Sequence, residues 1–389
     1  MKHIYLDHAS TTPVDPEVVK AMQPYFTKKY GNASSLHAFG REAYDALDES
    51  RNQVASLIHA RKQEIIFTAG GTEADNMALK GLARVYQDRK EKKGPHIITS
   101  AIEHPAILEP CRYLEKQGFT VEYLSVDDQG IIDLDQLQET ISKNTFLISI
   151  MAANNEIGTI QPIEQIGKLA RDHEILFHTD AVQAIGKIPV NVQKMRIDLL
   201  SMSSHKIYGP KGVGALFLGE GIRINPLVHG GGHERGLRST TENIPGVVGF
   251  AKACELAGKR MDQDVPYLKH LRDKLIKNIG SIEESYLNGH RTKRLVNNAH
   301  FRFSAVEGES LLLHLDDNGI AAATGSACSS KKLQASHVLV ALGVPQEEAH
   351  GSLRLTLGRG NTEEEIDKTI EVLPKIIERL RMMSPLWNK

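Results

Sequence analysis

The chain changes from apolar to polar residues within the stretch Leu199-Leu200-Ser201-Met202-Ser203-Ser204-His205-Lys206-Ile207-Tyr208-Gly209-Pro210. An apolar run passes directly into polar residues and then into glycine and proline, which predicts a buried strand that ends in a loop. Working outward, six more short apolar runs share this pattern and predict a seven-stranded sheet: Glu64–Phe67, His96–Thr99, Val121–Leu124, Phe146–Met151, Ile175–His178 and Gly214–Leu218.

Longer amphipathic stretches separate these runs. They are Glu73–Tyr86, Ala106–Gln117, Asp135–Ile141 and Ile163–His173. Strands that alternate with helices are typical of an α/β fold in which helices cover a sheet. Ligands of such sheets bind beyond the carboxyl ends of the strands, so we expect the chemistry in the residues that directly follow each apolar run.

The last third of the chain has a different pattern of apolar and polar residues. From about Gly246 it shows long helical patterning with a predicted break at Asp262–Pro266. A strand-like run at Asn298–Phe303 and a closing helix over Thr362–Met382 follow. These features predict a second, smaller α+β domain.

Composition narrows the class of protein. The chain has 389 residues and a formal net charge of −1, so no overall field attracts nucleic acid or an anionic membrane. No apolar run approaches the roughly 20 residues of a membrane-spanning helix, and the start lacks the features of a signal or transit peptide. We therefore expect a cytoplasmic protein that binds neither membranes nor nucleic acid directly. Three cysteines without Cys-x-x-Cys spacing argue against a disulfide framework or a zinc ribbon.

Two predicted strand ends offer an acid and an amine. Asp180 follows the run that ends at His178, and Lys206 follows the run that ends at Met202. A lysine held at a buried strand end has a lowered pKa and can condense with an aldehyde, and a carboxylate can keep a pyridine ring protonated. Taken singly, each residue has a simpler explanation, because most lysines are surface charges and most such aspartates cap helices.

A third feature is the turn Phe67-Thr68-Ala69-Gly70-Gly71-Thr72-Glu73. Free backbone N–H groups at a helix start, together with the Thr72 hydroxyl, can bind a phosphate, and glycine lets the main chain approach it closely. The same letters also suit an ordinary tight turn and helix cap. A metal site is not expected, although His178 and Asp180 lie two residues apart, because no His-x-x-x-His or cysteine pair completes a ligand set.

These three features occur in a chain that, as a whole, resembles the cysteine desulfurases of the class V aminotransferase family. The resemblance is nearly end to end and rests on Tyr5–Pro13, Gly70–Asn76, Thr99–His104, Asn154–Gly158, His205–Gly212, His229–Glu234, Gly325–Ser329 and Arg354–Arg359. It implies the fold of pyridoxal-phosphate enzymes of the aspartate aminotransferase type. A large domain would span residues 14–257, and residues 1–13 and 258–389 would form the small domain.

The resemblance also implies roles for individual residues. Lys206 would bond to the cofactor aldehyde, Asp180 would pair with the pyridine nitrogen, Gln183 would reach the ring hydroxyl and His104 would stack on the ring and act as an acid or base. The phosphate would be held near Gly71 by Thr72, Ser203 and His205, with Thr241 added from the second subunit of a homodimer. Asn155 and Arg354 would bind the substrate carboxylate, for which a guanidinium fork is well suited, and Asn155 would also contact the cofactor.

Cys328 is the nucleophile that this resemblance requires. Its surroundings, Gly325-Ser326-Ala327-Cys328-Ser329-Ser330-Lys331-Lys332, are small and polar, and two lysines favour the thiolate. Cys111 and Cys254 lie on helical patterns and are expected to be buried. The implied reaction converts L-cysteine to L-alanine and leaves the sulfur on Cys328 as a persulfide, for a protein acceptor in iron–sulfur cluster assembly or for tRNA thiolation.

Other readings remain open on the sequence alone. A selenocysteine lyase, an aminotransferase or a kynureninase-like hydrolase could use the same fold. A Ser/His/Asp or metal hydrolase could use His178, Asp180 and His205, and it would be colourless. A catalytically silent protein could keep the fold and only dock assembly factors.

Overall fold

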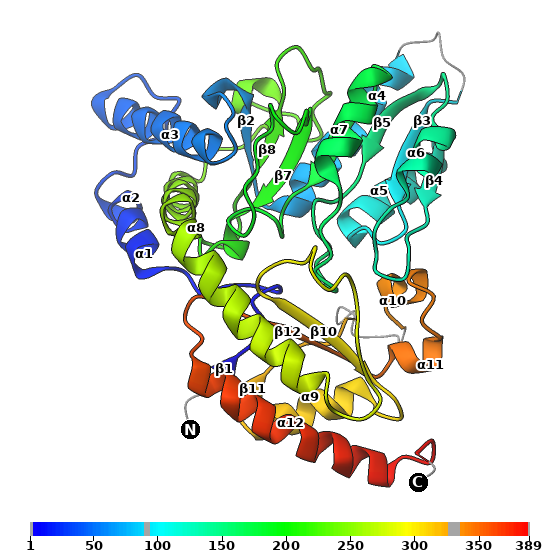
Figure 1. Ribbon diagram of the computed structural model, residues 1–389. Helices are drawn as coiled ribbons and strands as arrows, with labels where there is room; N and C mark the ends of the chain where they lie inside the picture. Colours follow the sequence, from blue (N-terminus) through cyan, green and yellow to red (C-terminus); the bar gives the residue numbers. More distant parts are fainter. Residues whose placement is uncertain (1–2, 89–93, 326–334, 388–389) are drawn as a thin grey trace.

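A seven-stranded sheet forms the centre of the larger lobe in this computed structural model, which describes residues 3–88, 94–325 and 335–387 (Figure 1). The strand order is β2-β8-β7-β6-β5-β3-β4. Its strands are β2 (Ile65–Thr68), β3 (His96–Ser100), β4 (Thr120–Leu124), β5 (Thr145–Ser149), β6 (Leu176–Asp180), β7 (Leu199–Ser203) and β8 (Gly214–Leu218). β8 runs antiparallel to both neighbours, and the other pairs are parallel. The predicted α/β class and seven strands are confirmed.

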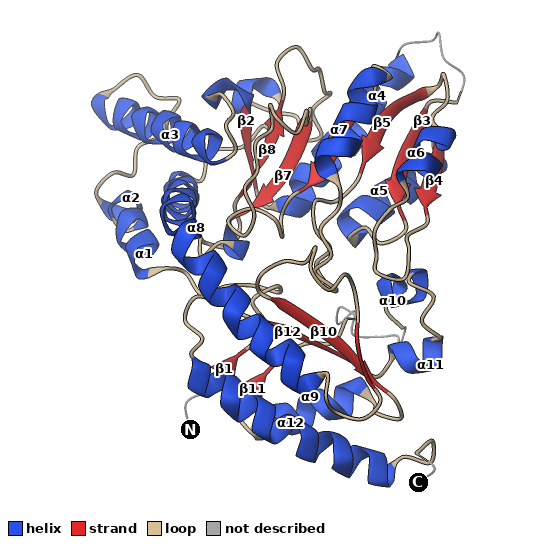
Figure 2. Ribbon diagram, viewed as in Figure 1, coloured by secondary structure: helices blue, strands red, loops and turns tan. Residues whose placement is uncertain are grey.

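Helices cover both faces of this sheet (Figure 2). On one face, α4 (Gly71–Asp88) and α5 (Pro105–Glu115) pack their apolar residues against Phe146, Leu199 and Leu216. On the other face lie α3 (Ala38–Leu57), α6 (Leu134–Thr140), α7 (Ile163–Asp172) and the first part of α8 (Ile244–Ile279). Because both faces are covered, the strands other than the edge strand β4 are buried almost throughout and have continuous apolar sequences.

One prediction about the helices is wrong. α8 runs without interruption from Ile244 to Ile279, although the sequence favoured a break at Asp262–Pro266. Pro266 removes one backbone N–H from the helix interior, which ordinarily weakens a helix. Here the helix buries apolar side chains on both sides of the proline, with Ala257 in one core and Leu268 in another. Tertiary packing therefore holds the helix together across the proline.

The smaller lobe contains a three-stranded antiparallel sheet in the order β12-β10-β9. Its strands are β9 (Ser285–Leu287), β10 (Asn298–Phe303) and β12 (Ser352–Thr356), and a parallel pair of β1 (Ile4–Tyr5) and β11 (Ile320–Ala321) lies beside them. The helices α9 (Gly308–Asp317) and α12 (Glu363–Met383) cover this lobe, with α10 (His337–Ala341) and α11 (Gln346–Ala349) at its edge (Figure 1). The short helices α1 (Pro16–Met22) and α2 (Pro24–Thr27) lie beside α8.

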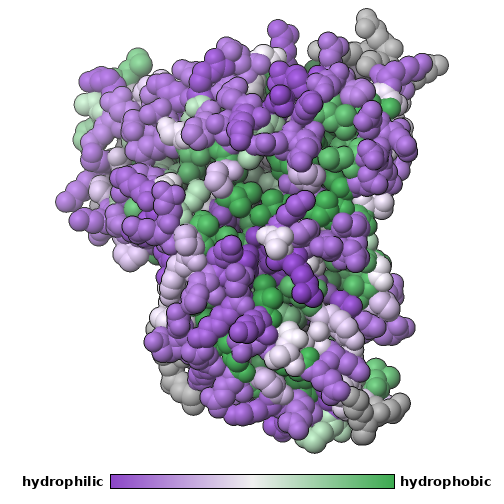
Figure 3. Space-filling model, in the orientation of Figure 1, coloured by the Kyte–Doolittle hydropathy of each residue, from purple (hydrophilic) through white to green (hydrophobic). Residues whose placement is uncertain are grey.

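The large and small lobes have separate hydrophobic cores. The large-lobe core includes Phe177 and Ala257, and the small-lobe core joins Ile4 and Leu6 to Leu268 and later residues. We propose that the lobes correspond to the predicted domains, residues 14–257 and residues 1–13 with 258–389. In Figure 3 the surface is mostly hydrophilic, and hydrophobic residues are visible on this face mainly where the lobes meet. Within the described residues, no helix is both long enough and apolar enough to cross a membrane.

The register of the sheet brings the predicted chemistry to one edge. In the parallel pair of β6 and β7, Asp180 lies opposite Ser201. The 3-10 helix η2 (Ser204–Lys206) follows β7 directly. Asp180 and Lys206 therefore leave the sheet at the same edge, facing the small lobe, as expected for the carboxyl ends of parallel strands.

Candidate active site

A cavity of about 480 Å³ lies at this edge of the sheet, between the lobes. This volume is in the usual range for sites that bind small molecules. The large lobe lines it with Gly71, Thr72, Asp75, His104, Met151, Ala153, Asn155, Asp180, Val182, Gln183, Ser203, His205 and Lys206. The small lobe and the N-terminal segment add Asp7, Ala9, Ser10, Leu312, Ala322, Ala323, Thr324, Gly325 and Arg354.

Lys206 presents its amine to this cavity. The Nζ atom donates hydrogen bonds to the carbonyl oxygens of Ala9 at 2.5 Å and Ser10 at 2.7 Å. Burial, followed by the nearby positive charge of Arg354, lowers the pKa of Lys206 to about 8. A substantial fraction of the amine is therefore neutral and nucleophilic near physiological pH.

Two buried carboxyl groups, those of Asp75 and Asp180, line the same cavity. Asp180 ends β6, and its Oδ1 accepts a hydrogen bond from the Val182 N–H at 2.9 Å. Burial raises the pKa of Asp180, while His104, the Val182 N–H and Lys206 act to lower it. Burial and the charge of Asp180 raise the pKa of Asp75 well above its ordinary value. We therefore assign the charge of the pair to Asp180 and the proton to Asp75.

The start of α4 forms an anion-binding end of the cavity. Gly71 begins this helix of 18 residues, so its first N–H groups lack intrahelical partners. A Cβ atom at Gly71 would lie 2.7 Å from Val182 Cγ2, and glycine therefore keeps this wall open. The hydroxyl-bearing residues Thr72 and Ser203 line the same cavity, as does His205. His205 contacts Thr11 Oγ1 through Nδ1 at 3.1 Å, and burial lowers its pKa to about 4.

His104 and Gln183 lie on the walls. His104 caps α5, and its Nδ1 accepts a hydrogen bond from the Ala106 N–H at 3.1 Å. Burial lowers the pKa of His104, so the ring is neutral at neutral pH and its proton resides on Nε2. Gln183 is anchored by a hydrogen bond from its Nε2 to the Ala9 carbonyl oxygen at 2.9 Å.

Arg354 projects into the cavity from β12. Its Nη1 donates to the carbonyl oxygen of Asn155 at 3.1 Å. Its Nη2 donates to Asp7 Oδ1 at 3.0 Å and Ser10 Oγ at 2.8 Å. The Nε atom is buried, and none of the residues that the structure describes forms a hydrogen bond with it. A fixed guanidinium with a spare donor suits the recognition of a small carboxylate.

Two of the residues considered in the sequence analysis, Thr241 and His178, lie away from this arrangement. Thr241 is exposed and is absent from the cavity lining. Cys328 falls outside the described residues. His178 is fully buried between Ser149 Oγ at 2.9 Å and Ser201 Oγ at 3.1 Å and does not line the cavity, which leaves a hydrolase using His178 without an accessible histidine. Across the described parts of the chain, no group of three His, Cys, Asp or Glu side chains is placed to hold a metal ion.

The residues present fit pyridoxal phosphate. The cofactor combines an aldehyde, a basic ring nitrogen and a phosphate. The cavity offers an amine with a lowered pKa at Lys206, a buried carboxylate at Asp180 and an anion-binding helix start at Gly71. His104 and Gln183 complete the walls that would contact the ring.

Sequence reasoning assigned no role to Asp7, Ser10 or Asp75. Asp7 and Ser10 are separated from Arg354 by more than 340 residues, and only the fold shows the contact. Asp75 is the fifth residue of α4 and lies two residues beyond Glu73, the last residue of the predicted phosphate-binding turn. The signal available in the sequence was its position three and four residues before Ala78 and Leu79, which places the acid on the apolar face of the helix.

Comparison with known proteins agrees with this geometry. The family model "Aminotransferase class-V" matches residues 4–369. The cysteine desulfurase IscS of Dictyoglomus turgidum is 53% identical over 385 residues, covering 99% of this chain and 97% of that protein. A solved NifS-like protein superposes with a TM-score of 0.90 at 39% identity, covering 98% of this chain and 100% of the other. A structure described as SspA in complex with cysteine superposes with a TM-score of 0.80 at 35% identity, covering 91% of this chain and 98% of the other.

The fold and cavity define an α/β enzyme that depends on pyridoxal phosphate. Within that class, the chain belongs to the class V aminotransferase family, in its branch of IscS- and NifS-like cysteine desulfurases.

Proposed function

We propose that this protein is a pyridoxal-phosphate-dependent cysteine desulfurase that converts L-cysteine to L-alanine and transfers the sulfur to Cys328. The observation that carries the proposal is the meeting of three groups in one cavity: the Lys206 amine, the Asp180 carboxylate and the Arg354 guanidinium. The first two suit the cofactor, and the third suits an amino acid substrate.

Lys206, Asp180 and Gln183 would hold the ring of the cofactor, and Gly71, Thr72, Ser203 and His205 would hold its phosphate. When bound, pyridoxal phosphate supplies an electron sink that stabilises negative charge at the substrate Cα. Asp180 favours that role because its negative charge keeps a pyridine nitrogen protonated.

The remaining chemistry falls to side chains of the chain. Arg354 and Asn155 orient the carboxylate of L-cysteine, so that its Cα–H bond faces Lys206. The Lys206 amine accepts the Cα proton, which its lowered pKa permits near neutral pH. His104, neutral and with its proton on Nε2, is placed to donate or accept the proton that the sulfur end of the substrate exchanges.

The sulfur step balances without an external oxidant. The Cys328 thiolate attacks the substrate sulfur, the substrate Cβ–S bond breaks and an S–S bond forms on Cys328. The carbon skeleton takes up a proton and leaves as L-alanine. The enzyme then carries a persulfide whose outer sulfur can pass to an acceptor thiol.

The first test is the absorbance spectrum of the purified protein before and after addition of L-cysteine, together with alanine formation. We expect a visible band from the bound cofactor, a change in that band on adding cysteine, and one alanine per sulfur released. A colourless protein, or a coloured one that forms no alanine from cysteine, would refute the proposal.

The role of Cys328 is tested against the two other cysteines. Cys111 and Cys254 are buried, and burial raises the pKa of both thiols, so they make matched controls. Cys328→Ala should keep the cofactor band and lose alanine formation and the protein-bound persulfide. Cys111→Ala and Cys254→Ala should retain both. Desulfurase turnover by Cys328→Ala would overturn this assignment.

The homodimer is part of the proposal. Thr241 is exposed in the single chain and does not line its cavity, so it is available to the cavity of a second copy. Large apolar side chains are also exposed from α2 to the start of α3, as expected for a surface that another subunit covers, among them Phe26, Tyr30, Leu36 and Phe39. The acceptor of the sulfur would be an iron–sulfur scaffold protein or a carrier for tRNA thiolation, and the cytoplasm remains the expected location.

A further inference from the structure

The turn that carries Lys206 has an unusual backbone. Tyr208, two residues after Lys206, has φ of +66°, in the left-handed region that aromatic residues rarely adopt. Such a conformation costs free energy and persists only where surrounding contacts hold it. The contacts of Tyr208 therefore help to determine where Lys206 lies.

The N-terminal segment holds this turn through its backbone. The Tyr208 N–H donates to Thr12 Oγ1 at 2.8 Å, and the Thr12 hydroxyl donates to the carbonyl oxygen of His205 at 2.9 Å. The Asp15 N–H donates to the carbonyl oxygen of Tyr208 at 2.9 Å. These bonds leave the side chain of Tyr208 to be fixed by something else.

Arg359 supplies that contact from the small lobe. Its backbone N–H donates to Tyr208 Oη at 2.8 Å. Its guanidinium lies over the Tyr208 ring, with Cζ 3.9 Å from the ring centroid, a favourable cation–π geometry. Arg359 follows β12, the strand that carries Arg354. The short segment Arg354–Arg359 therefore carries the expected substrate-binding arginine and also contacts the turn that carries Lys206.

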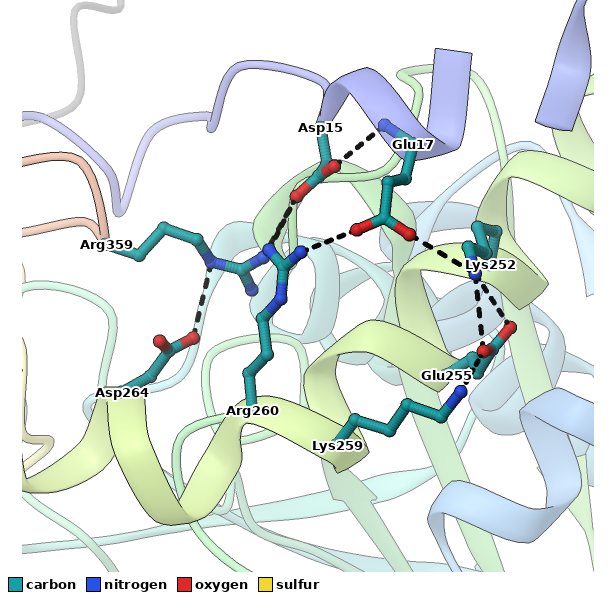
Figure 4. Close-up of polar contacts among 8 residues, drawn as sticks. All are labelled: Asp15, Glu17, Lys252, Glu255, Lys259, Arg260, Asp264 and Arg359. Carbon is teal, nitrogen blue, oxygen red and sulfur yellow. Dashed lines mark hydrogen bonds and ion pairs between the residues drawn. The ribbon is translucent and has the colours of Figure 1, made fainter. Parts of the chain in front are cut away.

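Acidic residues keep the Arg359 guanidinium in place. Nη1 lies 3.2 Å from Asp15 Oδ2, and Nε lies 3.3 Å from Asp264 Oδ2 (Figure 4). Asp15 belongs to the N-cap of α1, and Asp264 belongs to α8. Arg260 shares Asp15 Oδ2 at 2.9 Å but turns toward Glu17, and no contact of Arg260 with Tyr208 is found within the described residues.

We propose that Arg359 is a positioning residue that holds Tyr208 and thereby fixes the Lys206 amine relative to Arg354. Only the identity of Lys206 as the reactive amine rests on the proposed function. Removing the Arg359 side chain should loosen the turn and let water reach Lys206. The pKa of Lys206, now lowered chiefly by burial, should then rise toward its ordinary value.

Other charged and titratable groups also face the amine or lie next to it, and they stay unchanged in this test. They are Asp7, His104, Asp180, Lys187, His205 and Arg354. A shift caused by Arg359 must therefore come from the position of the turn, since Arg359 is not among the charges that set the pKa of Lys206.

The test measures the pKa of Lys206 in cofactor-free protein by competitive labelling with acetic anhydride across a pH series. Arg359→Ala should raise that pKa by about one unit, which is about tenfold less neutral amine at a given pH below it. Arg260→Ala removes an arginine from the same ion cluster and should leave the pKa of Lys206 unchanged. A pKa in Arg359→Ala equal to that in Arg260→Ala would overturn the proposal.

A milder variant separates an effect on the pKa of Lys206 from a general loss of folding. Tyr208→Phe keeps the ring under Arg359 and removes only the acceptor for its N–H. We expect a shift in the same direction, about threefold in neutral amine, with folding retained by circular dichroism. A pKa of Lys206 equal to the wild-type value in folded Tyr208→Phe would contradict the proposal. The labelling needs no turnover, so it decides the role of Arg359 even if the wild-type protein forms no alanine from cysteine.

Discussion

Arg354 Nη2 lies 3.0 Å from Asp7 Oδ1, across 347 residues of sequence. The guanidinium is thus paired with a carboxylate of its own chain, and its Nη1 is held by the Asn155 carbonyl oxygen at 3.1 Å. These bonds fix the plane of the fork before any substrate binds. The cost of ordering a long side chain is therefore met in the folded protein, which favours tight binding of a carboxylate.

Replacing Arg354 with lysine should raise KM for L-cysteine by tenfold or more, on the order of 1.4 kcal/mol in binding. Lysine keeps the charge but cannot present two parallel donors. The measurement is alanine formation as a function of cysteine concentration. Arg302→Lys is the control, since Arg302 lies on the adjacent strand and pairs with Glu348 outside the cavity. Equal KM values in both variants would contradict the assignment.

The charge of Asp180 should matter more than its shape. Asp180→Asn keeps an oxygen that can accept the Val182 N–H, now bonded at 2.9 Å, but removes the charge opposite a pyridine nitrogen. Alanine formation should fall by roughly 100-fold or more, while the protein still takes up the cofactor. The control is Asp198→Asn, because Asp198 accepts the Phe177 N–H at 2.9 Å at the opposite end of the same strands. Near-normal turnover in Asp180→Asn would argue against its pairing with the ring.

Much of this architecture follows from local sequence. Each of the seven strands was predicted to within two residues at its start. Most of them are covered by helices on both faces and are therefore continuous apolar runs, whereas the edge strand β4 alternates between exposed and half-buried residues. The placement of Asp180 and Lys206 at one edge follows from the parallel register of β6 and β7. Pattern and topology together were sufficient for these features.

Contacts between distant segments were not predictable in this way. The bonds of Asp7 and Ser10 to Arg354 depend on how the N-terminal segment crosses the cavity. The break predicted at Asp262–Pro266 failed because two hydrophobic cores hold α8 on either side of the proline. Local propensity describes a single segment, whereas these outcomes depend on packing between segments.

Glu103 should make stability depend on pH. This residue is fully buried, and its Oε1 accepts hydrogen bonds from Ser100 Oγ at 2.7 Å and the Met151 N–H at 2.9 Å. Burial raises the pKa of Glu103 to about 8, against an ordinary value of 4.5. Between these pH values the folded protein binds a proton that the unfolded chain releases. The contribution of Glu103 to the free energy of unfolding is therefore largest below about pH 4.5 and is lost as the pH rises to about 8.

Glu103→Gln cannot titrate and should remove this contribution to the pH dependence. Relative to Glu103→Gln, the wild-type protein should lose up to about 3 kcal/mol in free energy of unfolding between about pH 5.5 and 8. Urea unfolding of cofactor-free protein measures the difference. Glu109→Gln, an exposed change on the following helix, should leave the wild-type slope intact. Parallel curves for wild type and Glu103→Gln would show that Glu103 is ionised in the folded protein.

Thr241 allows a test of the dimer by complementation. If each cavity takes Thr241 from the other subunit, Lys206→Ala and Thr241→Asp damage the site in different chains. In a mixed dimer of the two variants, one cavity then has an intact Lys206 and an intact Thr241. The Asp side chain would repel the cofactor phosphate, so each variant alone should have little activity.

Unfolding and refolding the two variants together at equal concentrations should restore about a quarter of wild-type activity, since half of the dimers are mixed and each has one good site. Lys206→Ala mixed with Asp180→Asn is the control. Both residues line the same cavity of one chain, so no mixed dimer has an intact site. Recovery only in the first mixture would place Thr241 at the partner's cofactor. Two mixtures that stay equally inactive would mean that Thr241 does not serve the cavity of a second copy.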